Sequence, residues 1–232
     1  MAGQTVTITG ADGEFTGYLA SPAVGRGPGI VVIQEIFGIN SDMREIADAL
    51  AARGYFALAP DLFWRLQPGV QLSAKIPEEF QKAFGLMGAF DKDKGIADIQ
   101  ATIDHLRAMS DVTGKVGAVG YCLGGLLAYL TAARTNVDAS VSFYGVNLQN
   151  MLGEVSNIKK PLLMHVAGKD KFVPPEAQAA ILDGIKKNPL VTAHVYPGME
   201  HAFARPHGEH FDQGCAELAN TRTAAFFRQH LS

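Results

Sequence analysis

The sequence has little cysteine, no excess of basic charge and no long apolar run. Two cysteines in 232 residues exclude a disulfide framework and a four-cysteine zinc site, and they leave room for one reactive thiol. The formal net charge of −3 predicts neither a nucleic-acid partner nor an anionic membrane surface. No stretch of about 18 apolar residues occurs, so we expect no transmembrane helix.

The first ten residues, MAGQTVTITG, contain no basic segment that leads into an apolar one. We therefore expect no signal peptide and a cytoplasmic location. Hydrophobic residues make up 47% of the chain and charged residues 19%, which is typical of a packed globular core. One domain that spans residues 1–232 is expected, because α/β domains of this size are usually single. The oligomeric state stays open, with a monomer slightly favoured.

Predicted strands and helices alternate along the chain. The Asp12-Gly13 pair predicts a hairpin between two alternating segments, and the apolar run 29–33 is typical of a strand covered on both faces. Ser41 or Asp42 is expected to cap the helix that follows. Residues 62–92 are less regular and predict a short helical excursion of the kind that shapes binding sites. The other expected strands cover 55–59, 115–120, 137–144, 161–167 and 191–196, and the expected helices cover 41–53, about 16 residues around 96–106, 123–134, 174–187 and 214–230.

This alternation predicts the α/β class, with a mostly parallel central sheet and helices on both of its faces. In such sheets the chemical groups lie on loops beyond the carboxyl ends of the strands. The loops that follow the predicted strands are therefore the places to look for a site.

The strongest functional signal is the segment Gly120-Tyr121-Cys122-Leu123-Gly124, between a predicted strand and a predicted helix. It has the pattern of a nucleophile elbow, with cysteine in place of serine. The chain must turn within one residue there, so the neighbours of Cys122 must lack bulk. A thiol at a helix N-terminus can form a thiolate more readily, because the helix dipole favours an anion.

Two further residues fit the order that a nucleophile, an acid and a histidine follow in this fold class. Asp170 follows one predicted strand and His201 follows the next, so both belong at the same sheet edge as Cys122. His201 would take the thiol proton, and Asp170 would hold the imidazole in the correct tautomer.

The chain resembles the dienelactone hydrolases, the cysteine branch of the α/β-hydrolase fold. The resemblance extends over nearly the whole length of the chain. Its most specific feature is the combination of the cysteine elbow with the segment Gln34-Glu35-Ile36-Phe37-Gly38. The matching segments are Gln34-Glu35-Ile36-Phe37-Gly38, Ala59-Pro60-Asp61-Leu62, Gly120-Tyr121-Cys122-Leu123-Gly124-Gly125, Tyr144-Gly145, Gly168-Lys169-Asp170, Phe172-Val173-Pro174 and His201-Ala202-Phe203-Ala204-Arg205.

The resemblance implies an α/β-hydrolase fold with a small lid excursion, a triad of Cys122, Asp170 and His201, and no cofactor. It also implies that Glu35 lies near the thiol and takes part in its activation when substrate binds. A carboxylate in that place would oppose a resting thiolate. The backbone N–H groups of Leu123 and Ile36 would form the oxyanion hole.

The resemblance assigns substrate binding to Arg205, whose fork-shaped guanidinium suits a substrate carboxylate. It also implies a second arginine in the 62–92 excursion, but this sequence has Phe80 there and Lys82 as the nearest cation. This difference leaves a less charged ester or lactone open as substrate. Trp64 and Tyr144 are further candidates for the pocket wall, although packing explains each of them equally well.

Two weaker signals do not fit a known pattern. His201, His207, Glu209 and His210 match no defined zinc spacing, so no metal site is predicted. Cys215 lies near the start of the last predicted helix and is interpreted as a packing or surface residue.

The sequence therefore predicts a cofactor-free cysteine hydrolase that opens small lactones or related esters through an acyl-thioester, with a small-molecule substrate as its partner. Three alternatives remain. One is a general carboxylesterase or thioesterase with a less charged substrate. Another is a noncatalytic binding protein with this fold. The third is a redox-sensing thiol protein, which would need Cys215 close to Cys122.

Overall fold

The computed structural model describes residues 3–23 and 25–232. These residues form one eight-stranded sheet with the strand order β1-β2-β4-β3-β5-β6-β7-β8. Strand β2 runs antiparallel to both of its neighbours, and the other neighbouring pairs are parallel. The strands are β1 (Gln4–Gly10), β2 (Gly13–Ala20), β3 (Gly27–Ile33), β4 (Phe56–Pro60), β5 (Val112–Tyr121), β6 (Ala139–Phe143), β7 (Leu162–Ala167) and β8 (Val191–Tyr196).

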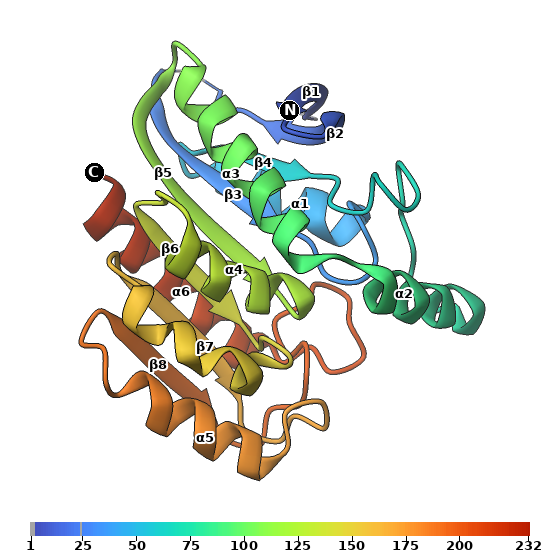
Figure 1. Ribbon diagram of the computed structural model, residues 1–232, viewed down its shortest axis with the longest axis vertical. Coiled ribbons are helices and arrows are strands. Elements are labelled where there is room, and N and C mark those ends of the chain that lie inside the picture. Colours follow the sequence, from blue (N-terminus) through green and yellow to red (C-terminus); the bar gives the residue numbers. More distant parts are fainter. Residues whose placement is uncertain (1–2, 24) are drawn as a thin grey trace.

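Helices cover both faces of this sheet, as the alternation of elements predicted. Figure 1 shows α3, α4 and α5 in front of the sheet and α1 and α6 behind it. The layers bury strands such as β3 on both sides, which explains its unbroken apolar run. The helices are α1 (Ser41–Ala51), α2 (Pro77–Ala89), α3 (Lys92–Ala108), α4 (Leu123–Arg134), α5 (Pro175–Ile185) and α6 (Gln213–Leu231), with a 3₁₀ segment η1 (Leu148–Asn157).

Several local predictions need correction. Neither Ser41 nor Asp42 caps α1, because the helix already begins at Ser41 and the side chain of Asn40 accepts from the Met43 amide at 3.2 Å. Strand β6 ends before Tyr144, whose positive φ of 37° takes the chain out of extended geometry. The segment η1 was not predicted, since a 3₁₀ turn has no 3.6-residue apolar period.

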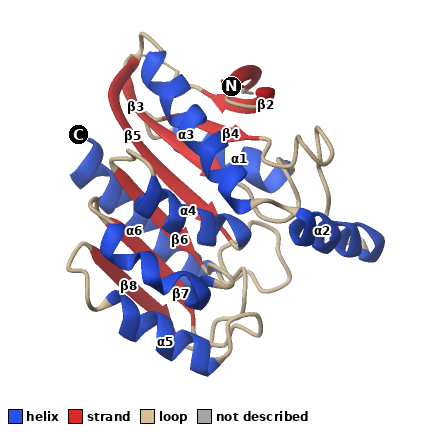
Figure 2. Cartoon of the chain, viewed as in Figure 1, coloured by secondary structure: helices blue, strands red, loops and turns tan. Residues whose placement is uncertain are grey.

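The excursion over residues 62–92 contains α2, which projects away from the sheet (Figure 1). Ala83 is the one buried residue of this helix, and the partly buried Phe80, Leu86 and Met87 also pack against the core. The loops after the strands gather at the edge of the sheet that lies next to α2 (Figure 2). This arrangement places the expected chemical groups and the excursion at the same end of the molecule.

No helix in the described residues is long and apolar enough to cross a membrane. The prediction that the chain has no signal peptide rests on residues 1–10. Of these, Met1 and Ala2 lie outside the described residues.

Candidate active site

The nucleophile elbow has the sharp geometry that its glycines predict. Cys122 stands between β5 and α4 with φ 57° and ψ −115°, a conformation that non-glycine residues rarely adopt. A Cβ atom on Gly120 would lie 1.9 Å from the Gly124 carbonyl oxygen, and one on Gly124 would lie 2.3 Å from the Ile33 carbonyl oxygen. Only glycine allows strand, turn and helix to approach so closely.

Asp170 and His201 meet at the same sheet edge, although they are 31 positions apart in the chain. Nδ1 of His201 lies 2.7 Å from Oδ2 of Asp170, and both side chains are buried. The other carboxylate oxygen of Asp170 accepts from the Phe172 amide at 2.9 Å. The acid is therefore held from two sides and fixes the orientation of the imidazole ring.

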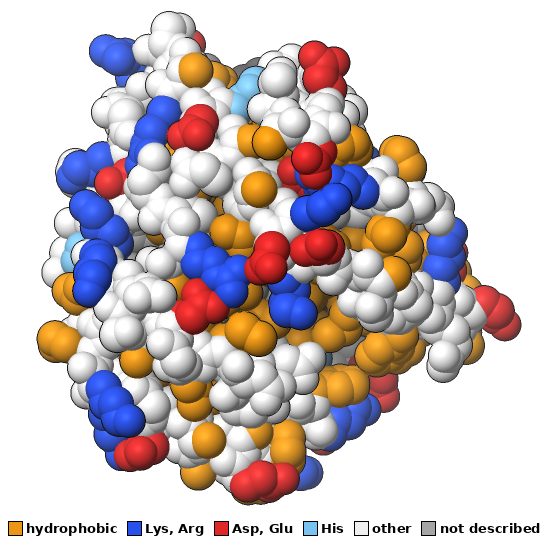
Figure 3. Space-filling view, viewed as in Figure 1, with side chains coloured by type: hydrophobic (Ala, Val, Ile, Leu, Met, Phe, Trp, Pro, Cys, Tyr) orange, Lys and Arg blue, Asp and Glu red, His pale blue; other side chains and the backbone are white. Residues whose placement is uncertain are grey.

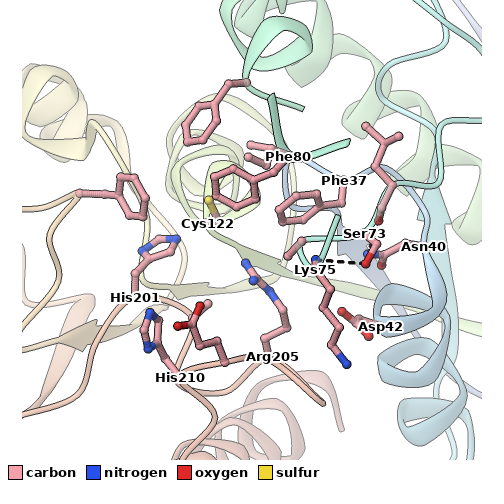
Figure 4. A pocket seen from close by; sticks show the side chains of 18 of the residues that line it. Phe37, Asn40, Asp42, Ser73, Lys75, Phe80, Cys122, His201, Arg205 and His210 are labelled. Atoms are coloured by element: carbon pink, nitrogen blue, oxygen red, sulfur yellow. Dashed lines mark hydrogen bonds between the residues drawn. The ribbon is translucent and has the colours of Figure 1, made fainter. Parts of the chain in front are cut away.

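The second ring nitrogen of His201, Nε2, is buried and has no hydrogen-bond partner among the described residues. His201 and Cys122 line the same cavity, and Figure 4 shows their side chains pointing toward one another. Burial by itself lowers the pKa of His201, but the Cys122 sulfur and the Asp170 carboxylate outweigh this effect and raise it. The raised pKa makes the imidazole a stronger base than a free histidine, which suits a group that accepts a proton at this site.

Glu35 and Arg205 form a bidentate ion pair in which Glu35 is buried behind the cavity wall and Arg205 is half-buried. Nε of Arg205 lies 2.7 Å from Oε2 of Glu35, and Nη2 lies 3.1 Å from Oε1. Although burial lowers the pKa of Arg205, the Glu35 carboxylate outweighs burial and raises it, so the guanidinium stays charged. Arg205 lines the cavity, and its Cζ lies 5.1 Å from the ring centroid of Phe37. A substrate anion that binds Arg205 must therefore compete with Glu35.

The cavity has a volume of about 730 Å³ and opens beside α2. In the space-filling view, hydrophobic side chains gather next to this helix and Lys, Arg, Asp and Glu side chains surround them (Figure 3). The apolar lining consists of Ile36, Phe37, Leu72, Phe80, Phe84, Met87, Val146 and Phe172. The polar and charged lining includes Asn40, Ser41, Asp42, Lys75, Lys171, His207, Glu209 and His210.

The backbone amides of Leu123 and Ile36, the two expected oxyanion donors, have no backbone acceptor in the described residues. Leu123 is the first residue of α4, so its N–H has no carbonyl partner within the helix. Ile36 follows β3 and lines the cavity. Both amides can therefore donate to an oxyanion.

Neither Trp64 nor Tyr144 lines the cavity, so packing is the role that the structure gives to both candidates. Trp64 lies outside the cavity, stacked on Phe15 at 5.6 Å, and its indole N–H donates to Asp98 at 3.0 Å. Tyr144 lies beneath the site, where its ring contacts the ring of His201 edge-to-face at 5.2 Å. Phe80 does line the cavity.

Lys82 is the cation nearest to Phe80 in the sequence, but it is not part of the cavity wall. Lys75 at the near rim and Lys171 from the loop after β7 line the cavity instead. Phe172 was part of a matching segment but was not predicted as a site residue. Its position two residues after Asp170 was the available signal, since the same loop must approach the histidine.

The weak candidates lie apart from one another. Nε2 of His207 is 3.2 Å from Oε2 of Glu45, whereas Nε2 of His210 is 3.4 Å from Oε2 of Glu200. Within residues 3–23 and 25–232, no group of three or more His, Cys, Asp or Glu side chains has metal-binding geometry. Cys215 is half-buried at the start of α6, and its amide donates to Asp212 at 2.8 Å.

The sheet order, the elbow and the acid–histidine pair on consecutive strand loops define a hydrolase with the α/β-hydrolase fold. Solved structures agree with this class. The "Dienelactone Hydrolase-like Promiscuous Phospotriesterase P91" from metagenomic libraries is 26% identical with a TM-score of 0.80 over 100% of both chains. A dienelactone hydrolase from Anabaena variabilis is 20% identical with a TM-score of 0.73, again over 100% of both chains.

The particular family follows from the sequence comparisons. The model of the dienelactone hydrolase family matches residues 15–231, and the chain belongs to this family. The "Carboxymethylenebutenolidase" of Pseudomonas putida is 41% identical over 227 residues, which cover 97% of this chain and 96% of that protein. A "Putative carboxymethylenebutenolidase" of Azospirillum brasilense is 52% identical over 224 residues, 96% of each chain. The protein is thus a hydrolase of the carboxymethylenebutenolidase type, with a small-molecule ester or lactone as substrate.

Proposed function

We propose that Cys122 is the nucleophile of this hydrolase and that the reaction passes through an acyl-thioester. The observation that carries the proposal is the buried Asp170–His201 pair, whose free Nε2 is directed at the cavity that holds the cysteine. The positive φ of Cys122 supports it, because such strain is retained where a side chain must be presented to a ligand.

The steps follow from these positions. His201 Nε2 takes the thiol proton, and the Cys122 sulfur attacks the carbonyl carbon. The N–H groups of Leu123 and Ile36 stabilise the oxyanion. The C–O bond of the ester or lactone then breaks, the alkoxide or enolate oxygen receives the proton from His201, and the thioester remains. Water, deprotonated by His201, attacks the thioester and releases the acid and the thiol.

Glu35 and Arg205 adjust this reaction to the substrate. At rest the Arg205 charge is compensated by Glu35. An anionic substrate group that binds Arg205 would release Glu35 toward the thiol region, where the freed carboxylate stabilises the imidazolium that forms when His201 takes the thiol proton. In this proposal the thiol is activated only when substrate is present, which protects it from oxidation between turnovers.

A general carboxylesterase or thioesterase is the second candidate. The observation that favours it is the apolar lining around Phe80, where the resemblance predicts an arginine. Arg205 is then the main anchor for an anionic group, and neutral esters fit the rest of the cavity.

The first experiment tests the nucleophile. Cys122→Ala should abolish turnover and leave the circular dichroism spectrum and the melting temperature nearly unchanged. Mass spectrometry of acid-quenched wild-type reactions should detect an acyl group on Cys122, whereas His201→Ala should show little, because acylation and deacylation both use this base. Full activity of Cys122→Ala would overturn the cysteine mechanism, and no hydrolysis by the wild type would favour a noncatalytic binding protein.

The second experiment separates the two substrate classes. Initial rates of the wild type and of Phe80→Arg are compared on cis- and trans-dienelactone and on simple aryl esters. A preference of the wild type for the lactones would mean that Arg205 and its neighbours suffice for the charged substrate. A preference for neutral esters that Phe80→Arg reverses would favour the second candidate.

A further inference from the structure

Four phenylalanine rings form a continuous arc in the cavity between Arg205 and His201. Starting at the arginine, the ring centroids of Phe37 and Phe80 are 5.8 Å apart, and those of Phe80 and Phe84 are 5.1 Å apart. The centroids of Phe84 and Phe172 are 6.3 Å apart. The last ring, Phe172, contacts the His201 ring edge-to-face at 4.9 Å. Figure 4 shows Phe37 and Phe80 close to Cys122 on the side away from His210.

The two ends of the arc differ in what they contact. The Phe37 end lies against Arg205, which holds a charge. The Phe172 end lies against His201, the group that gives a proton to the departing oxygen. Because that proton passes from His201 Nε2 to the leaving group, the leaving group must lie on the His201 side of the sulfur. The acyl part of the substrate then extends toward Phe37 and Arg205.

The outer pair, Phe84 and Phe172, is left open to solvent. Each has 38% of its surface exposed, although both line a cavity and pack against neighbouring rings. Large apolar side chains that stay exposed inside a cleft are typical of a surface that a ligand covers. The Phe172 amide also donates to Asp170, which ties the backbone of this residue to the Asp170–His201 pair.

From these contacts we infer that Phe84 and Phe172 form a leaving-group subsite that takes the planar aromatic alcohol of an ester. The inference rests on the proposed cysteine mechanism and specifies the substrate class for it. The two rings pack on the faces or edges of a flat group at the distances that aromatic pairs prefer. They offer no polar group to a small alkyl alcohol, which would leave both rings exposed. Phe84 and Phe172 are thus specificity-determining residues, and they do not act on the acyl part.

The test keeps the acyl group constant and changes the alcohol. Phenyl and 2-naphthyl acetate are compared with a fluoroalkyl acetate whose alcohol is about as acidic as phenol, so that intrinsic leaving-group ability is similar. Phe84→Ala is the main variant, because Phe84 is a partly exposed helix residue whose removal should not disturb the fold. Lys82→Ala, on the same helix but outside the cavity, is the matched control.

Phe84→Ala should lower kcat/KM for the two aryl esters about tenfold and change kcat/KM for the fluoroalkyl ester less than about twofold. Phe172→Leu should act in the same direction. Deacylation, measured as the slow phase after the burst, should be unchanged, because all three acetates give the same acyl-enzyme. Lys82→Ala should leave every rate unchanged.

Three results would overturn the inference. They are an equal loss on aryl and fluoroalkyl esters, a change in the deacylation rate of Phe84→Ala, and wild-type kinetics of Phe84→Ala on the aryl esters. Cys122→Ala is measured in the same series. If it stays active, the proposed mechanism fails. If it is inactive and Phe84→Ala behaves as wild type, only the leaving-group subsite fails.

Discussion

At the scale of single residues, the elbow needs glycine because a side-chain carbon would collide with neighbouring backbone. A Cβ on Gly124 would meet the carbonyl oxygens of Ile33 and Gln34 at 2.3 and 2.5 Å. A Cβ on Gly85, in α2, would meet no atom within 4 Å among the described residues. Two glycines of the same chain therefore have different physical roles.

Gly124→Ala should destabilise the protein by about 2–4 kcal/mol, because strand β3 and helix α4 must separate to admit the methyl group. Gly85→Ala should be neutral or stabilising by up to about 1 kcal/mol, since alanine costs less backbone entropy in a helix. Urea unfolding of both variants measures the difference. Equal stability of the two would contradict the close approach seen at the elbow.

The pair of Glu35 and Arg205 makes a second residue-scale prediction. Arg205→Met leaves a buried carboxylate without its partner and should destabilise by about 3–5 kcal/mol, whereas the double variant Glu35→Leu with Arg205→Met should be less destabilised. A double-mutant cycle from chemical denaturation measures the coupling. Additive effects of the two substitutions would show that the pair contributes nothing to stability.

At the scale of elements, a buried carboxylate joins the start of the excursion to helix α3. Asp98 accepts from the Trp64 indole at 3.0 Å and from two nitrogens of Arg65, one of them at 3.0 Å. Asp98 is almost fully buried, and its contact is the main reason why the pKa of Arg65 is raised. The same cluster explains why Trp64 faces away from the cavity.

Asp98→Ala should lower the free energy of unfolding by about 2–4 kcal/mol, because the indole N–H and the guanidinium both lose their acceptor. Asp93→Ala, whose side chain is 84% exposed on the same helix, should change stability by less than about 1 kcal/mol. Thermal melts of the two variants test this. A mild effect of Asp98→Ala would mean that packing alone holds the excursion.

At the scale of the whole molecule, a buried histidine connects β7, β8 and α6. His165 Nδ1 lies 2.9 Å from the Tyr196 hydroxyl, and Nε2 lies 3.0 Å from Thr223 Oγ1. Burial, helped by the charges of His194 and Arg222, lowers the pKa of His165 to about 3. The folded protein therefore keeps this ring neutral at pH values where the unfolded chain protonates it.

The sign of the pH effect follows from the depressed pKa. Above about pH 6.5 the ring is neutral in both states, and as the pH falls toward 3 only the unfolded state gains the proton. Stability should fall by roughly 1.4 kcal/mol per pH unit in this window from His165 alone. His165→Gln should be less stable at pH 8 but lose less stability between pH 6.5 and 5. Parallel curves for wild type and variant would contradict this account.

All strands in the described residues belong to one sheet, so we propose that residues 1–232 unfold as a single domain. Circular dichroism and tryptophan fluorescence should report the same denaturation midpoint, because the one tryptophan, Trp64, is joined to α3. Two separated transitions would indicate that the excursion unfolds by itself.

Much of the fold was predictable because local patterns agreed with the global one. The helix 123–134 and the strand 191–196 have the predicted bounds, since apolar periodicity and turn residues act over short distances. The chain order of Cys122, Asp170 and His201 was likewise visible, because parallel strands bring successive loops to one edge. The Asn40 cap and η1 escaped prediction, because a cap depends on the first helical residue and a 3₁₀ turn has no distinct apolar period.

The fold class, the family and the residues of the candidate triad could be read from the amino-acid sequence, since each is written in a contiguous segment or in the order of segments. Tertiary packing alone set which side chains face the cavity. It turned Trp64 toward Asp98 and brought Glu35 to Arg205 across 170 positions of the chain. It also joined Phe84 of α2 to Phe172 of a distant loop. Such contacts depend on how separate elements pack, and no local pattern encodes that.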